Sequence, residues 1–103
     1  MTKIIARFHF PLNDNDGNSR LETHKQFSRN LNKLAGGFTS WTAFGHWVES
    51  FGRQYNEPVH VYEAAIDDTD ADEFISLCKD AGRATQQLTI FTILDGRPAI
   101  TKL

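Results

Sequence analysis

Apolar and mixed positions alternate along the first segment of the chain, residues 3–10. Alternation with a period of two predicts a β-strand, because successive side chains of a strand point to opposite faces of a sheet. One side of this strand is entirely apolar: Ile4, Ala6, Phe8 and Phe10. The polar run at residues 13–18, preceded by Pro11, predicts a loop after the strand.

A helical pattern replaces the alternation from about residue 20. Ser19 and Glu22 have the three-residue spacing of a capping box, which marks a helix start. Gly36 and Gly37 readily adopt the left-handed conformation that ends a helix. Between these signals, a buried stripe recurs at intervals of three and four: Leu21, His24, Phe27, Leu31 and Leu34.

Aromatic side chains are concentrated in the middle of the chain. We interpret residues 38–48 and 58–66 as two strands of a long hairpin that turns near Arg53. A turn at that place would bring His46 roughly opposite His60. The aromatic residues of this region are Phe38, Trp41, Phe44, Trp47, Phe51, Tyr55 and Tyr62.

A second helix is predicted from Thr69, its expected N-cap, to about Gly82. Acidic residues at its start would interact favourably with the positive end of the helix dipole. Its inward stripe consists of Ala71, Phe74, Ile75, Cys78 and Ala81. A fourth strand follows over residues 88–94. The pair Asp95-Gly96 then predicts a turn into a short tail strand around Ala99 and Ile100.

This order of elements predicts an α+β fold of the ferredoxin-like βαββαβ type, formed by a single domain over residues 1–103. The four-stranded antiparallel sheet would carry both helices on one face. The other face would present Ile5, Arg7 and His9 with apolar residues of the fourth strand, and no third helix remains to cover it. We therefore expect another copy of the chain to cover that face. A monomer whose sheet is half exposed to water is the alternative.

Composition narrows the class of protein. The chain has 103 residues, with 11 basic and 13 acidic side chains and a net charge of −2, which argues against nucleic-acid partners. Its longest apolar stretches are a few residues, too short to cross a membrane. With Cys78 as the single cysteine, no internal disulfide can form, and a cytoplasmic location is expected.

Familiar chemical motifs are absent from the sequence. The run Asp14-Asn15-Asp16-Gly17 resembles a calcium loop, but the EF-hand spacing would put Leu12 and Thr23 at ligand positions, so we interpret it as a turn. Four histidines without a matching cysteine or acidic spacing predict no metal site. Phosphate-loop and nucleophile-elbow motifs are missing, and no cofactor is expected.

Glu57 differs from the other acidic residues in its setting. It directly precedes the apolar pair Pro58-Val59 and lies close to the aromatic hairpin. Burial beside aromatic rings would raise its pKa and direct it at a bound cation. An ordinary carboxylate at a strand edge is the alternative interpretation.

Four segments resemble a known group of proteins: Gly36-Gly37-Phe38-Thr39, Gly45-His46-Trp47, Glu57-Pro58-Val59-His60-Val61 and Gln86-Gln87-Leu88-Thr89-Ile90-Phe91. Together they are similar to PII-like proteins, which form trimers with nucleotide sites between subunits. Within that group the chain resembles the small phage-encoded S-adenosylmethionine lyases, which place a glutamate just before the third strand.

The resemblance implies a PII-like homotrimer with an adenosyl ligand between subunits, in the host cytoplasm if the chain is phage-encoded. It implies that Glu57 is catalytic and that no cofactor is needed. The second carboxylate expected near the fourth strand of a lyase appears here as Gln86 or Gln87. The implied substrate contacts are Phe38, Thr39, Trp41, Trp47, Tyr62 and Gln86.

Two other functions stay open at this stage. A PII-like trimer with the same cleft would also suit a protein that binds, senses or sequesters a small nucleotide without changing it. A cofactor-free oxygenase or isomerase would place its site between helices and sheet, with His24 as the candidate base. The lyase is the favoured hypothesis.

Overall fold

The computed structural model describes residues 2–13, 19–48 and 50–103, so the turn predicted at residues 14–17 lies outside the described residues. Within these ranges, neither helix is long and apolar enough to cross a membrane. The elements in chain order are β1 (Lys3–Pro11), α1 (Leu21–Ala35), β2 (Thr39–Val48), β3 (Gln54–Asp67), a 3₁₀ turn (Asp68–Asp70), α2 (Ala71–Ala84), β4 (Thr89–Leu94) and β5 (Arg97–Lys102).

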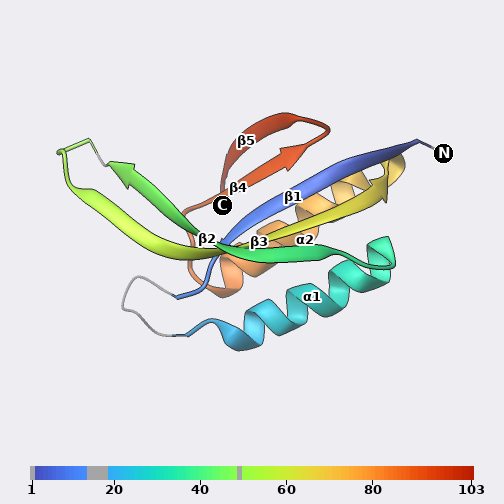
Figure 1. Ribbon diagram of the computed structural model, residues 1–103, viewed down its shortest axis with the longest axis horizontal. Coiled ribbons are helices and arrows are strands. Elements are labelled where there is room, and N and C mark those ends of the chain that lie inside the picture. The colour runs from blue at the N-terminus through green and yellow to red at the C-terminus, as the bar shows by residue number, and fades with distance from the viewer. Residues whose placement is uncertain (1, 14–18, 49) are drawn as a thin grey trace.

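The sheet has the order β2-β3-β1-β4-β5, and all neighbouring strands are antiparallel (Figure 1). Its first four strands follow the predicted ferredoxin-like order, but the expected strand count of four is wrong. Asp95 and Gly96 both have positive φ angles, 51° and 78°, which favour a tight hairpin turn. The tail therefore folds back along the whole of β4 as a fifth strand.

The β2–β3 hairpin continues beyond the rest of the sheet. Pairing between β1 and β3 ends at Pro11 and Val59, whereas β2 and β3 stay paired as far as Val48 and Gln54. The extra length projects as a two-stranded arm at the left of Figure 1. The expected pairing of His46 with His60 is wrong, because this register pairs them with Asn56 and Thr42.

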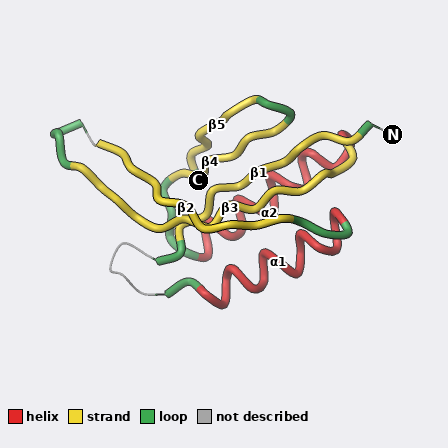
Figure 2. The backbone as a smooth tube through the Cα atoms, viewed as in Figure 1, coloured by secondary structure: helices red, strands yellow, loops and turns green. Residues whose placement is uncertain are grey.

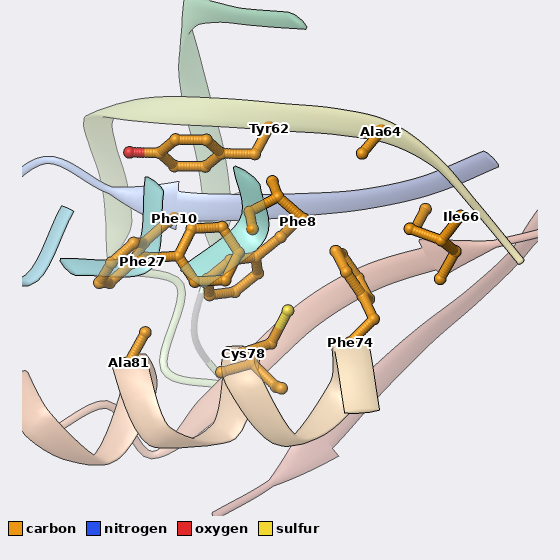
Figure 3. Close-up of a cluster of buried hydrophobic side chains, with 12 residues drawn as sticks. Phe8, Phe10, Phe27, Tyr62, Ala64, Ile66, Phe74, Cys78 and Ala81 are labelled. Atoms are coloured by element: carbon orange, nitrogen blue, oxygen red, sulfur yellow. The ribbon is translucent and has the colours of Figure 1, made fainter. Parts of the chain in front are cut away.

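Both helices pack on one face of the sheet, and the core lies between them and the strands (Figures 2 and 3). The apolar side predicted for β1 is confirmed, since Ala6, Phe8 and Phe10 are at most 1% exposed. Phe8 stacks on Phe10 with ring centroids 5.1 Å apart. From the second helix, Phe74, Cys78 and Ala81 enter the same core, which confirms the centre of its predicted stripe.

The helix ends agree with the sequence pattern in part. Gly36 ends α1 in the left-handed conformation, with φ of 80°, and donates its N–H to Asn32 over 2.8 Å. At the start, Ser19 Oγ accepts from the Leu21 N–H over 3.2 Å, and Leu21 is 56% exposed rather than buried. The Thr69 cap is wrong, because the 3₁₀ turn occupies that place and α2 begins at Ala71.

Candidate functional site

The sheet face turned away from the helices carries the candidate site. Because side chains alternate along each strand, the register that buries Phe8 under the helices places its neighbours Arg7 and His9 on this open face. The same register brings side chains of all five strands onto it. The open face therefore combines aromatic and apolar groups with a few charged ones: Ile5, Arg7, His9, Trp41, Trp47, Glu57, Glu63, Phe91 and Ile100.

Glu57 borders a groove of about 580 Å³ on the open face, which we call the Glu57 groove. This volume is in the range of small-molecule sites, roughly 300–1,000 Å³. Among the described residues that line the groove, Glu57 is the only carboxylate. The lining residues are His9, Gly45, His46, Trp47, Glu57, Val59, Gln87, Thr89, Phe91 and Ile100.

A glycine leaves room beside the carboxylate. Gly45 pairs with Glu57 across the β2–β3 ladder. A Cβ atom at Gly45 would lie 3.1 Å from the Trp47 ring and 3.5 Å from a Val59 methyl, tighter than ordinary contact on the Trp47 side. The absence of a side chain at Gly45 thus lets the Trp47 indole approach the backbone next to Glu57.

Two opposing effects act on Glu57. Burial raises the pKa of its carboxyl group, and the positive charge of Arg20 opposes that rise. The rise predicted from the sequence is therefore found, with its expected cause. A carboxylate beside aromatic faces favours a cationic ligand, because a ring face and a carboxylate both attract positive charge.

Arg20 connects the start of α1 with the Glu57 groove. Arg20 is only 6% exposed. In the amide orientation that satisfies the Gln87 side chain, Nη1 and Nη2 of Arg20 donate to Oε1 of Gln87, the second over 3.0 Å. Gln87 in turn lines the groove. The buried positive charge of Arg20 thus contacts Gln87, a side chain that lines the groove.

His9 lies in the same groove between neighbouring strands. Its ring packs against the Phe91 ring with centroids 4.7 Å apart. Within the described part of the chain, its Nε2 atom is buried without a hydrogen-bond partner. Burial, with a smaller contribution from Arg7, lowers the pKa of His9, so the ring favours its neutral form.

Three of the expected ligand contacts lie outside the Glu57 groove: Thr39 and Trp41 are on the open face, and Phe38 packs against the core beside Tyr62. Thr39 pairs with Glu63 rather than Glu57, so six residues of β2, roughly 20 Å at about 3.3 Å per residue, separate Thr39 from Gly45. With Phe38, it borders a second pocket of about 360 Å³. Trp41 lies between these positions, with the Arg7 guanidinium 5.8 Å from its ring centroid.

Two further candidates do not line the Glu57 groove. Tyr62 points to the helix side of the sheet, where it is 3% exposed and packs with the core (Figure 3). Gln86 has a positive φ of 59° and an exposed side chain, while its neighbour Gln87 reaches the groove. Of the expected catalytic and substrate-contact residues, the structure thus brings together Glu57 and Trp47.

His24 borders a different groove, on the helix side, of about 620 Å³. Its Nε2–H donates to the Pro11 carbonyl over 2.9 Å, which leaves Nδ1 to accept the Tyr62 hydroxyl over 2.6 Å. Burial lowers the pKa of His24 despite the bond to Pro11. Both ring nitrogens are therefore occupied by the fold, which disfavours His24 as a free base.

Sequence reasoning did not assign His9 or Arg20 to the site, and it named Gln87 only as one of two positions near the fourth strand. His9 had one usable signal, since it alternates with the buried residues of β1 and so had to face away from the helices. Arg20 had no such signal, because its contact with Gln87 joins a helix start and a loop that are far apart in the chain.

Comparison with known proteins shows the fold. Neither protein-family models nor curated proteins match the chain. Among solved structures, a phage SAM lyase in complex with S-methyl-5′-thioadenosine superimposes with a TM-score of 0.75 at 13% identity, covering 98% of this chain and 90% of that one. A phage SAM lyase in the apo state gives a TM-score of 0.56 at 14% identity, covering 96% and 84%. The chain therefore shares the fold of phage SAM lyases.

Proposed function

We propose that this chain is a lyase that cleaves S-adenosylmethionine, or a nucleotide derivative of it, at a site between subunits. The observation that carries the proposal is the Glu57 groove, where a half-buried carboxylate lies beside Trp47 and Phe91. This combination suits a sulfonium ligand, whose positive charge is attracted by a carboxylate and by ring faces. The shared fold with phage SAM lyases supports the same choice.

The proposed reaction needs no nucleophile from the protein. The carboxylate oxygen of the methionine moiety attacks its own γ-carbon and forms a lactone C–O bond. The bond from the γ-carbon to sulfur breaks, and sulfur keeps the electron pair. The products are methylthioadenosine and homoserine lactone, and atoms and charge balance without a proton transfer. The protein must fold the methionine tail into attack geometry, a positioning effect that contributes several kcal/mol in favourable cases.

Glu57 would orient the cationic end of the substrate in this reaction. Its carboxylate would hold the substrate in place by charge and hydrogen bonding, while the Trp47 ring contacts the sulfonium or the adenine. The role is electrostatic, because the substrate supplies both the attacking and the leaving atoms.

A PII-like homotrimer would complete the site. Thr39 and Trp41 do not line the Glu57 groove of their own copy. A neighbouring copy packed on the open face could bring its own Phe38, Thr39 and Trp41 to that ligand. The exposed apolar residues Ile5, Phe91 and Ile100 support such packing.

The deciding experiment is incubation of the purified chain with S-adenosylmethionine, followed by chromatography of the products. Methylthioadenosine and homoserine lactone should appear in equal amounts. Intact S-adenosylmethionine after prolonged incubation would contradict the lyase.

A binding protein that senses or sequesters a small nucleotide is the second candidate. It is favoured by one observation: position 87, at the edge of the groove, holds an amide where a lyase was expected to have a second carboxylate. Measurable binding of S-adenosylmethionine by calorimetry, without product, would select this alternative.

A further inference from the structure

Gln87 lines the Glu57 groove, and its contact with Arg20 orients its side-chain amide. A guanidinium group carries only donors, so the Arg20 side chain can bind only the oxygen of the Gln87 amide. The amide NH₂ is then the donor end of the side chain. A glutamine that could otherwise present either end is thus limited to donating hydrogen bonds.

The backbone around this pair is held as well. The Gln87 N–H donates to the Gly82 carbonyl over 2.9 Å, which ties the residue to the end of α2. The Arg20 N–H donates to the Leu12 carbonyl over 3.1 Å, and the Arg20 carbonyl accepts from the His24 N–H over 3.0 Å. Both ends of the side-chain contact are therefore fixed by main-chain bonds.

We propose that Arg20 is a positioning residue of the Glu57 groove, and that Gln87 recognises a carboxylate of the ligand through its NH₂ group. This inference rests on the proposed function and deepens it. Glu57 accepts and attracts positive charge, while Gln87 donates and has the Arg20 charge next to it. The groove therefore suits the zwitterionic amino-acid end of a ligand, the ammonium toward Glu57 and the carboxylate toward Gln87.

The contact itself is tested without ligand. In a ¹⁵N NMR spectrum of the unmodified chain, the two side-chain NH₂ protons of Gln87 are expected at distinct shifts and with slow exchange. Replacing Arg20 by Met should move these resonances and speed their exchange, while Arg20→Lys should restore them in part. Unmoved Gln87 resonances in a folded Arg20→Met variant would overturn the positioning role.

The recognition is tested with two probes that differ in the amino-acid end. S-adenosylmethionine carries a carboxylate, whereas methylthioadenosine lacks both the amino-acid end and the sulfonium charge. Gln87→Leu should weaken S-adenosylmethionine binding about tenfold, as expected for one hydrogen bond to a charged group, and leave methylthioadenosine unchanged. Gln86→Leu is the matched control, since that side chain is exposed and does not line the groove.

Each outcome has a separate meaning. Equal losses for both probes in Gln87→Leu, or equal losses in the Gln86 and Gln87 variants, would overturn carboxylate recognition. If the buried Arg20 cannot be replaced without unfolding, Gln87→Leu still removes the contact from its other side. Failure of the unmodified chain to bind S-adenosylmethionine would contradict the proposed function, whereas the NMR result would stand on its own.

Discussion

Glu57 lies directly opposite Gly45 in the β2–β3 ladder, and a side chain at position 45 would crowd the Trp47 ring. The register of this one strand pair therefore determines how Glu57, Gly45 and Trp47 lie relative to one another. Because β2 and β3 are paired through this point, the ladder fixes the relative placement of the three positions. The following predictions depend on this arrangement and on the faces of the sheet.

Replacing Glu57 by Gln should reduce methylthioadenosine formation by about 100-fold or more, the usual scale for losing a preorganised electrostatic group. The amide keeps the shape of the side chain and removes its charge. Product formation at saturating S-adenosylmethionine measures the effect. Glu73→Gln is the control, because Glu73 is an exposed acid on α2. An unchanged rate in the Glu57 variant would refute the role of its charge.

On acidification, binding of a cationic ligand should begin to weaken at a higher pH than it would if Glu57 had the pKa of an ordinary glutamate. Burial raises the pKa of Glu57 above its ordinary value of 4.5, so on acidification the carboxylate becomes neutral sooner. The affinity for the ligand is expected to be at its maximum above the raised pKa and to fall as the pH drops through it. Calorimetry over a pH series measures this, and Glu57→Gln should remove that step in the profile.

Truncating Trp47 to Ala should weaken S-adenosylmethionine binding about five- to thirtyfold, which corresponds to a cation–π contact of roughly 1–2 kcal/mol. Phe51→Ala is the matched control. Phe51 is an aromatic residue of the same hairpin, is 93% exposed and does not line the Glu57 groove. Equal losses in the two variants would show that the hairpin as a whole, rather than the Trp47 ring, is needed.

Placing a charge on the open face should dissociate the proposed trimer. Ile100 is 76% exposed on β5, so Ile100→Asp should leave the fold of one copy intact and disfavour packing of another copy against it. Sedimentation velocity is expected to report a trimer for the unmodified chain and a monomer for this variant. Leu21→Asp, at a 56% exposed helix position, should stay trimeric. A monomeric unmodified chain would contradict the shared site.

The free energy of unfolding should fall as the pH is lowered from about 6.5 toward 5. Burial lowers the pKa of His24, and the pKa values of His9 and His60 are shifted in the same direction. The unfolded chain then binds protons that the folded chain excludes, so stability rises with pH in this range. The slope is at most about 1.4 kcal/mol per pH unit for the buried His24, and the more exposed His9 and His60 contribute less because solvent screens them. Urea unfolding measures the slope. His24→Gln should reduce it, and an unchanged slope would contradict the assignment.

The local pattern was sufficient for most of the elements. The alternation in residues 3–10 predicted both the strand and its buried side, and Gly36 marked the end of the first helix because few residues tolerate a φ of 80°. Glu57 could also be singled out, since its apolar neighbours already implied burial. These are properties of consecutive residues, and consecutive residues can be compared directly in a sequence.

The exact strand register and the set of residues that form the site could not be predicted from these local patterns. The pairing of His46 with Asn56, the burial of Tyr62 on the helix side and the extension of β5 along β4 all depend on how strands align across the sheet. A shift of one residue exchanges the two faces of a strand, and the turn that sets the register leaves only a weak signal.

By itself, the sequence determined the element order, the apolar side of the first strand and the unusual setting of one glutamate. Only the tertiary structure decided which side chains share the groove with Glu57 and brought Arg20 against Gln87 beside it. The physical reason is that periodicity acts over a few residues, whereas these contacts join segments tens of residues apart through the packing of helices on the sheet.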